Sequence, residues 1–287
     1  MTLSHVIAFS PGHISGYFKP FLSDDPRTSG SMGGGIVINE GVTVTATLAE
    51  TNRVTVFMKE KTGEFIQVSD DSPVIRQLLE NLQVHASIET RCTLPLSSGY
   101  GLSAAALLAT VYAVNTLCHL GLNHNECAFH AHQVEVLFRT GLGDVSACQG
   151  GGWVVRRGPG IDADIIRTQD FRLINAVTLG PLKTTSVLSS PDMMTRISTA
   201  FPHTEPLTLE ELFRNSRMFA EESGLISDNI RKVLIECDAN DIPASMTMLG
   251  NGVFALGEQA TAVLSPFGRV YSLNIAECGP KILEPGA

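Results

Sequence analysis

A glycine-rich segment in the first half of the chain has residue types that can bind a phosphate group. Gly99 and Gly101 lie between a segment that alternates like a strand and an apolar segment that begins near Ser103 and has the composition of a buried helix. The first N–H groups of a helix have no intrahelical partner, and the helix dipole adds positive potential, so glycines there let an anion approach closely. The hydroxyls of Ser97 and Ser98 favour this interpretation. The alternative is a tight turn in which the glycines only satisfy backbone geometry.

Two common nucleotide-binding motifs do not account for this segment. Gly99, Gly101 and Ala104 formally match the dinucleotide fingerprint, but that motif needs a second parallel strand that ends in an acidic residue about 20 residues further on. A second helix with Glu126 in its first turn is expected there instead. The P-loop motif is excluded because the sequence contains no Gly-Lys dipeptide. The segment is therefore predicted to be a different kind of phosphate cradle.

Two carboxylates downstream of the glycine loop are candidates for chemistry. Glu135 lies at the margin of an apolar helix face, where burying a charge is costly unless a partner such as a cation compensates it. The alternative is an ion pair between Glu135 and Arg139, its i+4 neighbour, on a solvated face. Asp144 follows Gly141 and Gly143, whose small size lets an acidic side chain face a crowded cleft. The alternative for Asp144 is a cap on the next turn.

The composition limits the class of protein and the kind of partner. A chain of 287 residues, 44% of them hydrophobic and 17% charged, is long enough for about two domains with their own cores and too apolar to be disordered. Its net charge of −9 argues against a broad basic face for nucleic acid or anionic lipid, so we expect a small-molecule partner. The six cysteines include no C-x-x-C pair, and neither a signal peptide nor a membrane-spanning segment is recognised. These features predict a cytoplasmic protein with reduced thiols.

The positions of glycine, proline and helix-capping residues predict strands and helices without strict alternation, which favours an α+β fold. In the first half we expect strands over 6–8, 36–38, 42–48, 53–58, 84–89 and 153–156, and helices over 73–82, 103–121 and 123–141. A cluster of turn residues at 158–162 marks the expected domain change. In the second half we expect strands over 173–179, 253–256 and 269–275, and helices that begin at Thr208, Asp228 and Pro243.

Three segments, in the same order along the chain, resemble the motifs of the GHMP small-molecule kinases. Residues 95–105 resemble the second motif, P-x-x-x-G-L-G-S-S-A-A, with Tyr100 and Leu102 where the motif has leucine and serine. Residues 10–18 (SPGHISGYF) and 245–254 (SMTMLGNGVF) correspond to the first and third motifs. Together with residues 139–145 (RTGLGDV), these segments look most like the archaeal pantoate kinases within that superfamily.

The resemblance implies a fold and an activity. The fold is the two-domain α+β GHMP kinase fold, with an ATP-binding domain like ribosomal protein S5 domain 2 over residues 1–165 and a ferredoxin-like domain over 166–287. The activity is phosphorylation of the 4-hydroxyl of pantoate with ATP and Mg²⁺, on the archaeal route to coenzyme A. The alternatives are a GHMP kinase for homoserine, shikimate or mevalonate, and an inactive nucleotide-binding regulator. The resemblance also implies a homodimer, whereas the net charge is the reason that no nucleic-acid or membrane partner is expected.

The resemblance also implies roles for individual residues. Asp144 is the expected general base or hydroxyl orienter, and His13 occupies a position where many relatives carry a lysine or arginine. Mg²⁺ is expected to be held by Ser103 and Glu135. The expected ATP-binding residues are Pro95, Ser97, Ser98, Gly99, Gly101, Leu102, Ser103 and Ala104. The expected substrate-binding residues are Ser15, Lys19, Arg139, Gly250 and Asn251.

The sequence also contains candidate cations for a substrate carboxylate and a group of histidine and cysteine residues. The pantoate carboxylate needs a cationic or N–H anchor, for which Lys19, Arg139 and Arg156 are equally placed by the sequence. The four side chains of His124, Cys127, His130 and His132 could suggest zinc. A zinc site is not expected, because His130 and His132 are two residues apart on a helix and face different sides.

Overall fold

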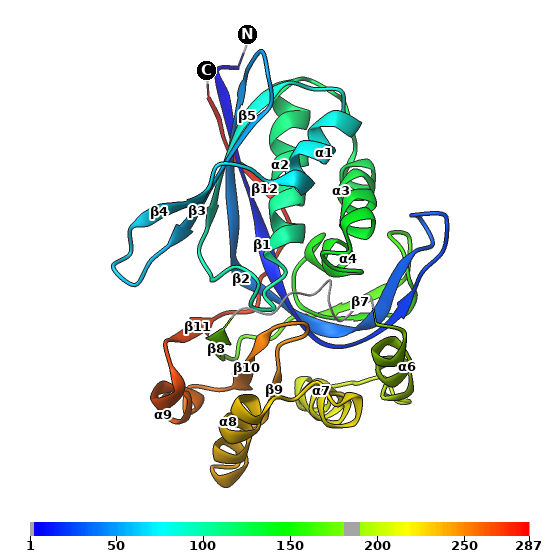
Figure 1. The fold of residues 1–287 in the computed structure, drawn as a ribbon, viewed down its shortest axis with the longest axis vertical. Helices are drawn as coiled ribbons and strands as arrows, with labels where there is room; N and C mark the ends of the chain where they lie inside the picture. Colours follow the sequence, from blue (N-terminus) through cyan, green and yellow to red (C-terminus); the bar gives the residue numbers. More distant parts are fainter. Residues whose placement is uncertain (1–2, 181–189, 287) are drawn as a thin grey trace.

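The computed structural model describes residues 3–180 and 190–286, in which the strands form two sheets (Figure 1). The larger sheet has the order β12-β1-β2-β5-β3-β4, with β6 paired to β2 and β7 paired to β6. Its strands are β1 (His5–Phe21), β2 (Gly30–Leu48), β3 (Arg53–Lys59), β4 (Phe65–Ser69), β5 (Ala86–Cys92), β6 (Trp153–Arg156), β7 (Ile165–Thr168) and β12 (Lys281–Gly286). All neighbours are antiparallel except β3 and β5.

The hairpin of β1 and β2 is much longer than the short strands predicted from the sequence. Both strands continue through glycines, and β1 also continues through Pro11 and Pro20, with register shifts after Pro11 and after Ser15. The glycines of β2 are required by close packing: a Cβ on Gly34 would lie 2.6 Å from the Tyr17 ring, and one on Gly35 would lie 2.3 Å from Nε2 of His13. The far half of the hairpin bends away from the rest of the sheet and lies beside residues 144–148 (Figure 1).

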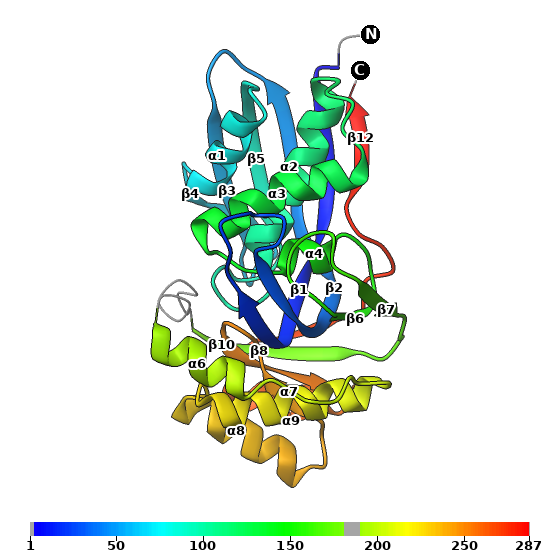
Figure 2. The same ribbon diagram turned by 90° about the vertical axis from the view of Figure 1, so that its right-hand side faces the viewer.

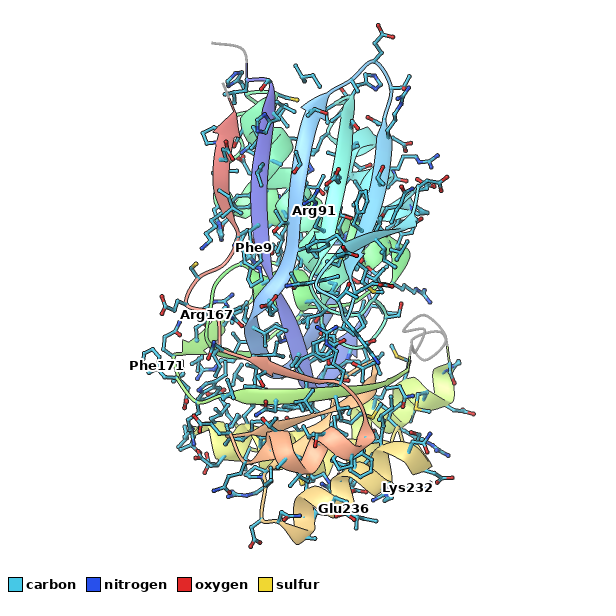
Figure 3. All side chains as sticks on the ribbon, turned by 90° about the vertical axis from the view of Figure 1, so that its left-hand side faces the viewer. Phe9, Arg91, Arg167, Phe171, Lys232 and Glu236 are labelled. Atoms are coloured by element: carbon cyan, nitrogen blue, oxygen red, sulfur yellow. The ribbon has the colours of Figure 1, made fainter. Side chains whose placement is uncertain are left out.

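Four helices cover one face of the larger sheet (Figure 2). They are α1 (Pro73–Asn81), α2 (Leu102–Leu117), α3 (His124–Phe138) and α4 (Asp144–Cys148). Helix α2 is buried on nearly every side, because it packs between the sheet and α3. Helix α3 begins with the expected capping box, in which Asn123 and Glu126 bond to each other's backbone N–H. Among the residues that the structure describes, no helix covers the opposite face of the sheet (Figure 3).

The smaller sheet, with the order β11-β8-β10-β9, belongs to the second half of the chain. Its strands are β8 (Ile174–Gly180), β9 (Ala244–Met246), β10 (Asn251–Leu256) and β11 (Val270–Leu273). The accompanying helices are α6 (Pro191–Thr199), α7 (Leu209–Ser223), α8 (Asp228–Ala239), α9 (Ala260–Leu264) and the 3₁₀ turn η1 (Ser265–Phe267). Helix α7 joins the two halves of the molecule, because Phe219 packs on Phe18 of β1 with ring centroids 5.7 Å apart.

Two expectations about the second half need correction. The division between residues 165 and 166 does not match the strand pairing, because β7 belongs to the larger sheet and β12 returns to pair with β1. The helix expected to begin at Pro243 is the short strand β9, whose pairing with β10 outweighs the local helix-start signal. In the described part of the chain, no helix has the length and apolar character needed to cross a bilayer.

Candidate active site

A pocket of about 470 Å³ lies where the glycine loop, the β1–β2 hairpin and the start of α4 meet. Its lining includes residues of the glycine loop, residues 73–75 in α1 and residues 90 and 92 in β5. The polar side chains of Ser15, Ser31, Asp144 and Arg156 also line it, together with the apolar side chains of Phe18, Leu142, Met248 and Leu249. The pocket therefore combines a glycine-rich turn with acidic, basic and apolar side chains.

The glycine loop presents the N-terminus of α2 to this pocket. Gly99 has φ +83° and Gly101 has φ +61°, a conformation that residues with a Cβ rarely adopt. Gly101 is the N-cap of α2 and has no side chain to cap the first N–H groups, and Leu102 and Ser103 both line the pocket. Backbone donors and the positive end of the helix dipole therefore meet at a place where a phosphate group fits.

The second half of the chain holds the glycine loop in place. The Thr247 hydroxyl donates to the Ser98 carbonyl at 3.2 Å, and the Tyr100 and Thr178 hydroxyls are 3.0 Å apart. A Cβ on Gly250 would lie 2.3 Å from the Ser98 carbonyl oxygen. Residues of the third motif therefore pack on the glycine loop. Tyr100, which stands where the second motif has leucine, links the loop to Thr178 of β8.

Replacement of Gly250 with alanine is expected to weaken ATP binding. The added methyl group must push the loop away from Ser98, and overpacking of this kind costs about 1–3 kcal/mol, or roughly tenfold in the KM for ATP. The matched control is Gly158→Ala, whose Cβ would meet only Ala163 at an ordinary 3.4 Å. Steady-state kinetics at varied ATP check the expectation, and an unchanged KM in Gly250→Ala would contradict it.

The two predicted catalytic residues are in direct contact. Nδ1 of His13 lies 2.7 Å from Oδ1 of Asp144. Burial lowers the pKa of His13, although the hydrogen bond to Asp144 opposes that shift. A carboxylate oxygen only accepts, so Nδ1 of His13 carries a proton and donates it to Asp144. Asp144 is the first residue of α4 and lines the pocket, with its side chain 21% exposed.

Glu135 lies behind Asp144 and does not line the pocket. Its Oε1 accepts the backbone N–H groups of Asp144 and Val145, at 3.0 and 3.2 Å. Its Oε2 lies 3.0 Å from Nδ1 of His132. Burial acts to lower the pKa of His132, but the hydrogen bonds to Glu135 and to the Ser29 carbonyl outweigh burial and raise it.

Arg156 is a buried cation that forms no ion pair with a carboxylate among the described residues. Its side chain reaches the pocket from β6, and the residue is only 2% exposed. Two long hydrogen bonds of 3.4 Å join it to Ser31, and Nη1 has no hydrogen-bond partner among the described residues. Burial lowers the pKa of Arg156, while the charge of Asp144 acts in the opposite direction. A buried guanidinium with free donors is a strong site for an anionic group of a ligand.

The structure brings most of the predicted ATP-binding residues to the pocket. Pocket-lining positions are Pro95, Ser97, Ser98, Gly99, Gly101, Leu102 and Ser103, together with Ser15 and Asp144. Ala104 instead lies in the core between α2 and α3.

Four residues predicted to bind substrate, Lys19, Arg139, Gly250 and Asn251, do not line the pocket. Gly250 instead packs against the Ser98 backbone behind the glycine loop. Lys19 stacks on Phe21, with its Nζ 5.7 Å from the ring centroid. Arg139 is the exposed C-cap of α3, and Asn251 accepts a hydrogen bond from Ser227. Whether these residues line the pocket depends on the direction of each side chain in the folded protein, which cannot be predicted from their spacing in the sequence.

Magnesium would need carboxylate or hydroxyl oxygens that face the pocket. Ser103 meets that requirement, but both oxygens of Glu135 already have protein partners and its side chain is 1% exposed. The described residues contain no cluster of three or more His, Cys, Asp or Glu side chains that could hold a metal ion. The pair Ser103 and Glu135 therefore does not fit a metal in this arrangement.

Three pocket residues are not among the predicted site residues. Ser31 reaches the pocket only because the hairpin bends, and Met248 and Leu249 of the third motif reach it because the two halves of the chain meet. Arg156 was one of three equal candidates, and its burial distinguishes it. His132 could have been linked to Glu135 by their i, i+3 spacing on α3.

Comparison with known proteins finds relatives along nearly the whole chain. The family model described as the GHMP kinases N terminal domain matches residues 69–152, which include the glycine loop and Asp144. A pantoate kinase of Methanospirillum hungatei is 54% identical over 99% of this chain and 98% of that relative, and one of Thermococcus kodakarensis is 30% identical over 93% and 94%. A solved structure described as a phosphotransferase related to the CoA biosynthesis pathway has a TM-score of 0.80 at 26% identity, over 97% of this chain and 98% of that one. The chain therefore belongs to the pantoate kinase family of the GHMP kinases.

Proposed function

We propose that the protein transfers the γ-phosphoryl group of ATP to the 4-hydroxyl of pantoate in the cytoplasm. The observation that carries this proposal is the place of Arg156, an unpaired buried guanidinium in the same pocket as Asp144. The Arg156 guanidinium can bind the carboxylate of a ligand, and the Asp144 carboxylate can accept a hydrogen bond from the hydroxyl of that ligand. This combination suits a short hydroxy acid. The identity to pantoate kinases along nearly the whole chain supports the same substrate.

ATP is proposed to bind with its phosphates against the start of α2. The backbone N–H groups at Gly101, Leu102 and Ser103 supply donors, and the helix dipole supplies positive potential. The remainder of the nucleotide would extend along the part of the pocket lined by α1 and β5.

Pantoate is proposed to bind in the part of the pocket that holds Arg156. The guanidinium would hold the carboxylate, with Ser31 beside it. Phe18, Leu142 and Leu249 supply an apolar wall for the two methyl groups of the substrate. This placement leaves the 4-hydroxyl free to approach Asp144.

Asp144 is proposed to receive the proton of the attacking hydroxyl. His13 donates to Oδ1, which leaves Oδ2 as the oxygen for the substrate. A Cβ at position 141 would lie 2.5 Å from that Oδ2, so Gly141 keeps the approach open. As the substrate oxygen forms its bond to the γ-phosphorus, the bond from that phosphorus to the bridging oxygen breaks and ADP leaves. The proton passes from the hydroxyl to Asp144.

A panel of acceptors with ATP tests the proposal. Purified protein is incubated with pantoate, homoserine, shikimate or mevalonate, and ADP formation is measured. We expect kcat/KM for pantoate to exceed the others by at least about 100-fold, because a site built for one set of polar groups rejects acceptors that leave those groups unpaired. If another acceptor has a kcat/KM equal to or above that of pantoate, pantoate is not the preferred substrate. If the protein binds ATP but forms no ADP with any acceptor, it is an inactive nucleotide-binding regulator.

A further inference from the structure

A buried hydrogen-bond network behind the pocket joins three segments of the chain. His132 and Glu135 are neighbours on α3, and both are 0% exposed. Nε2 of His132 lies 2.9 Å from the Ser29 carbonyl oxygen at the end of the β1–β2 hairpin. Oε1 of Glu135 accepts the N–H groups of Asp144 and Val145 in α4. The network therefore connects the helix, the hairpin and the segment that carries Asp144.

Both ring nitrogens of His132 and both carboxylate oxygens of Glu135 form hydrogen bonds within the protein. A carbonyl oxygen only accepts, so Nε2 of His132 carries a proton and donates it to Ser29. Nδ1 of His132 and Oε2 of Glu135 share a further proton at 3.0 Å. With two N–H groups on Oε1, both carboxylate oxygens of Glu135 are engaged by the protein itself.

Glu135 supplies what the start of α4 otherwise lacks. The first N–H groups of a helix need an acceptor, and the N-cap of α4 is Gly143, which has no side chain. Glu135 provides that acceptor from another helix and so fixes the backbone of Asp144. His13 fixes the side chain of the same residue at Oδ1. Asp144 is thus held at two points by groups from two different elements.

We propose that Glu135, held by His132, is a positioning residue for Asp144 and does not ligate a divalent cation. The inference rests on the proposed function in one respect, namely that Asp144 is the group that meets the substrate hydroxyl. In this role Glu135 and His132 fix the position of Asp144. The role differs from both earlier hypotheses for Glu135, which were a magnesium ligand and an exposed ion pair with Arg139.

Glutamine and leucine at position 135 separate the two roles. In Glu135→Gln the amide oxygen still accepts both N–H groups, and the amide N–H can donate to Nδ1 of a neutral His132. We therefore expect kcat of Glu135→Gln within about threefold of the wild type, and an unchanged magnesium concentration for half-maximal rate. In Glu135→Leu the two N–H groups lose their acceptor, and we expect kcat to fall about 100-fold with little change in the KM for ATP.

The control is Glu126→Gln, which changes an exposed carboxylate on the same helix and keeps an acceptor for the Asn123 N–H. Binding of Mn²⁺ with a non-hydrolysable ATP analogue, followed by electron paramagnetic resonance, is a readout independent of turnover. A fall of more than about tenfold in kcat or in Mn²⁺ affinity for a folded Glu135→Gln protein would overturn the inference, because a metal ligand needs the charged carboxylate.

Amide NMR signals keep this inference separate from the proposed function. If the wild type does not phosphorylate pantoate, the proposed function fails, but the amide signals of Asp144 and Val145 still test the network. Those signals are expected to be preserved in Glu135→Gln and shifted in Glu135→Leu. If the Asp144 and Val145 amide signals have the same chemical shifts in Glu135→Gln and Glu135→Leu, Glu135 does not fix the start of α4.

Discussion

Asp144→Asn is expected to lower kcat by about 10²–10⁴ while leaving ATP affinity unchanged. The asparagine amide keeps the shape of the side chain, and its oxygen can still accept the Nδ1–H of His13. It cannot take a proton from the substrate hydroxyl. The loss should therefore appear in the rate of phosphoryl transfer rather than in folding, because Asp144 is partly exposed at the pocket wall and its backbone contacts do not change.

Steady-state kinetics and calorimetric ATP binding measure the two effects separately. Asp228→Asn is a matched control, because Asp228 is an exposed aspartate that likewise begins a helix and does not line the pocket. Its kcat should equal that of the wild type. If Asp144→Asn weakens ATP binding by the same factor as it slows the reaction, Asp144 acts on the nucleotide and not on the hydroxyl.

Arg156→Met is expected to lower kcat/KM for pantoate by about 10²–10³, because truncating one partner of a buried charge pair costs about 2–5 kcal/mol. The effect should fall mainly on the KM for pantoate. Methionine fills much of the same volume, and Arg156 has no carboxylate partner to leave behind in the described structure. Thermal stability should therefore be maintained or increased, since a buried cation without a partner is costly to the folded protein.

Two further variants sharpen this test. Arg156→Lys should recover only part of the affinity, because an ammonium group cannot reproduce the bidentate geometry of a guanidinium. Arg157→Met changes the neighbouring arginine, which is exposed and pairs with Asp164 and Glu205, and should change the KM for pantoate little. The carboxylate assignment is refuted if both methionine variants raise that KM equally.

Local chemistry made several elements predictable. The capping box of Asn123 and Glu126 marked the start of α3, and Thr208 caps α7 through the Glu211 N–H as expected. These signals depend on residues three apart in the sequence, so they can be recognised without knowledge of the tertiary structure. The strand β9 shows the opposite case, because Pro243 precedes a segment whose conformation is set by pairing with β10.

The GHMP kinase fold could be anticipated from three short motifs, and the comparisons bear it out. The length of the β1–β2 hairpin could not, since its bulges and glycines make sense only against side chains on the opposite strand, such as Tyr17 and His13. The return of β12 to the edge of the first sheet likewise had no local signal.

For the site, the sequence by itself determined the glycine loop at the start of α2 and the aspartate that follows Gly143, because both lie in contiguous motifs. Only the tertiary structure decided that Arg156 turns its unpaired guanidinium into the pocket while Lys19 and Arg139 do not. It also placed Glu135 behind Asp144 instead of in the pocket. Spacing along a chain reports which residues can form a turn or share a helix face, whereas burial and partner depend on segments that are distant in sequence and meet only in the folded protein.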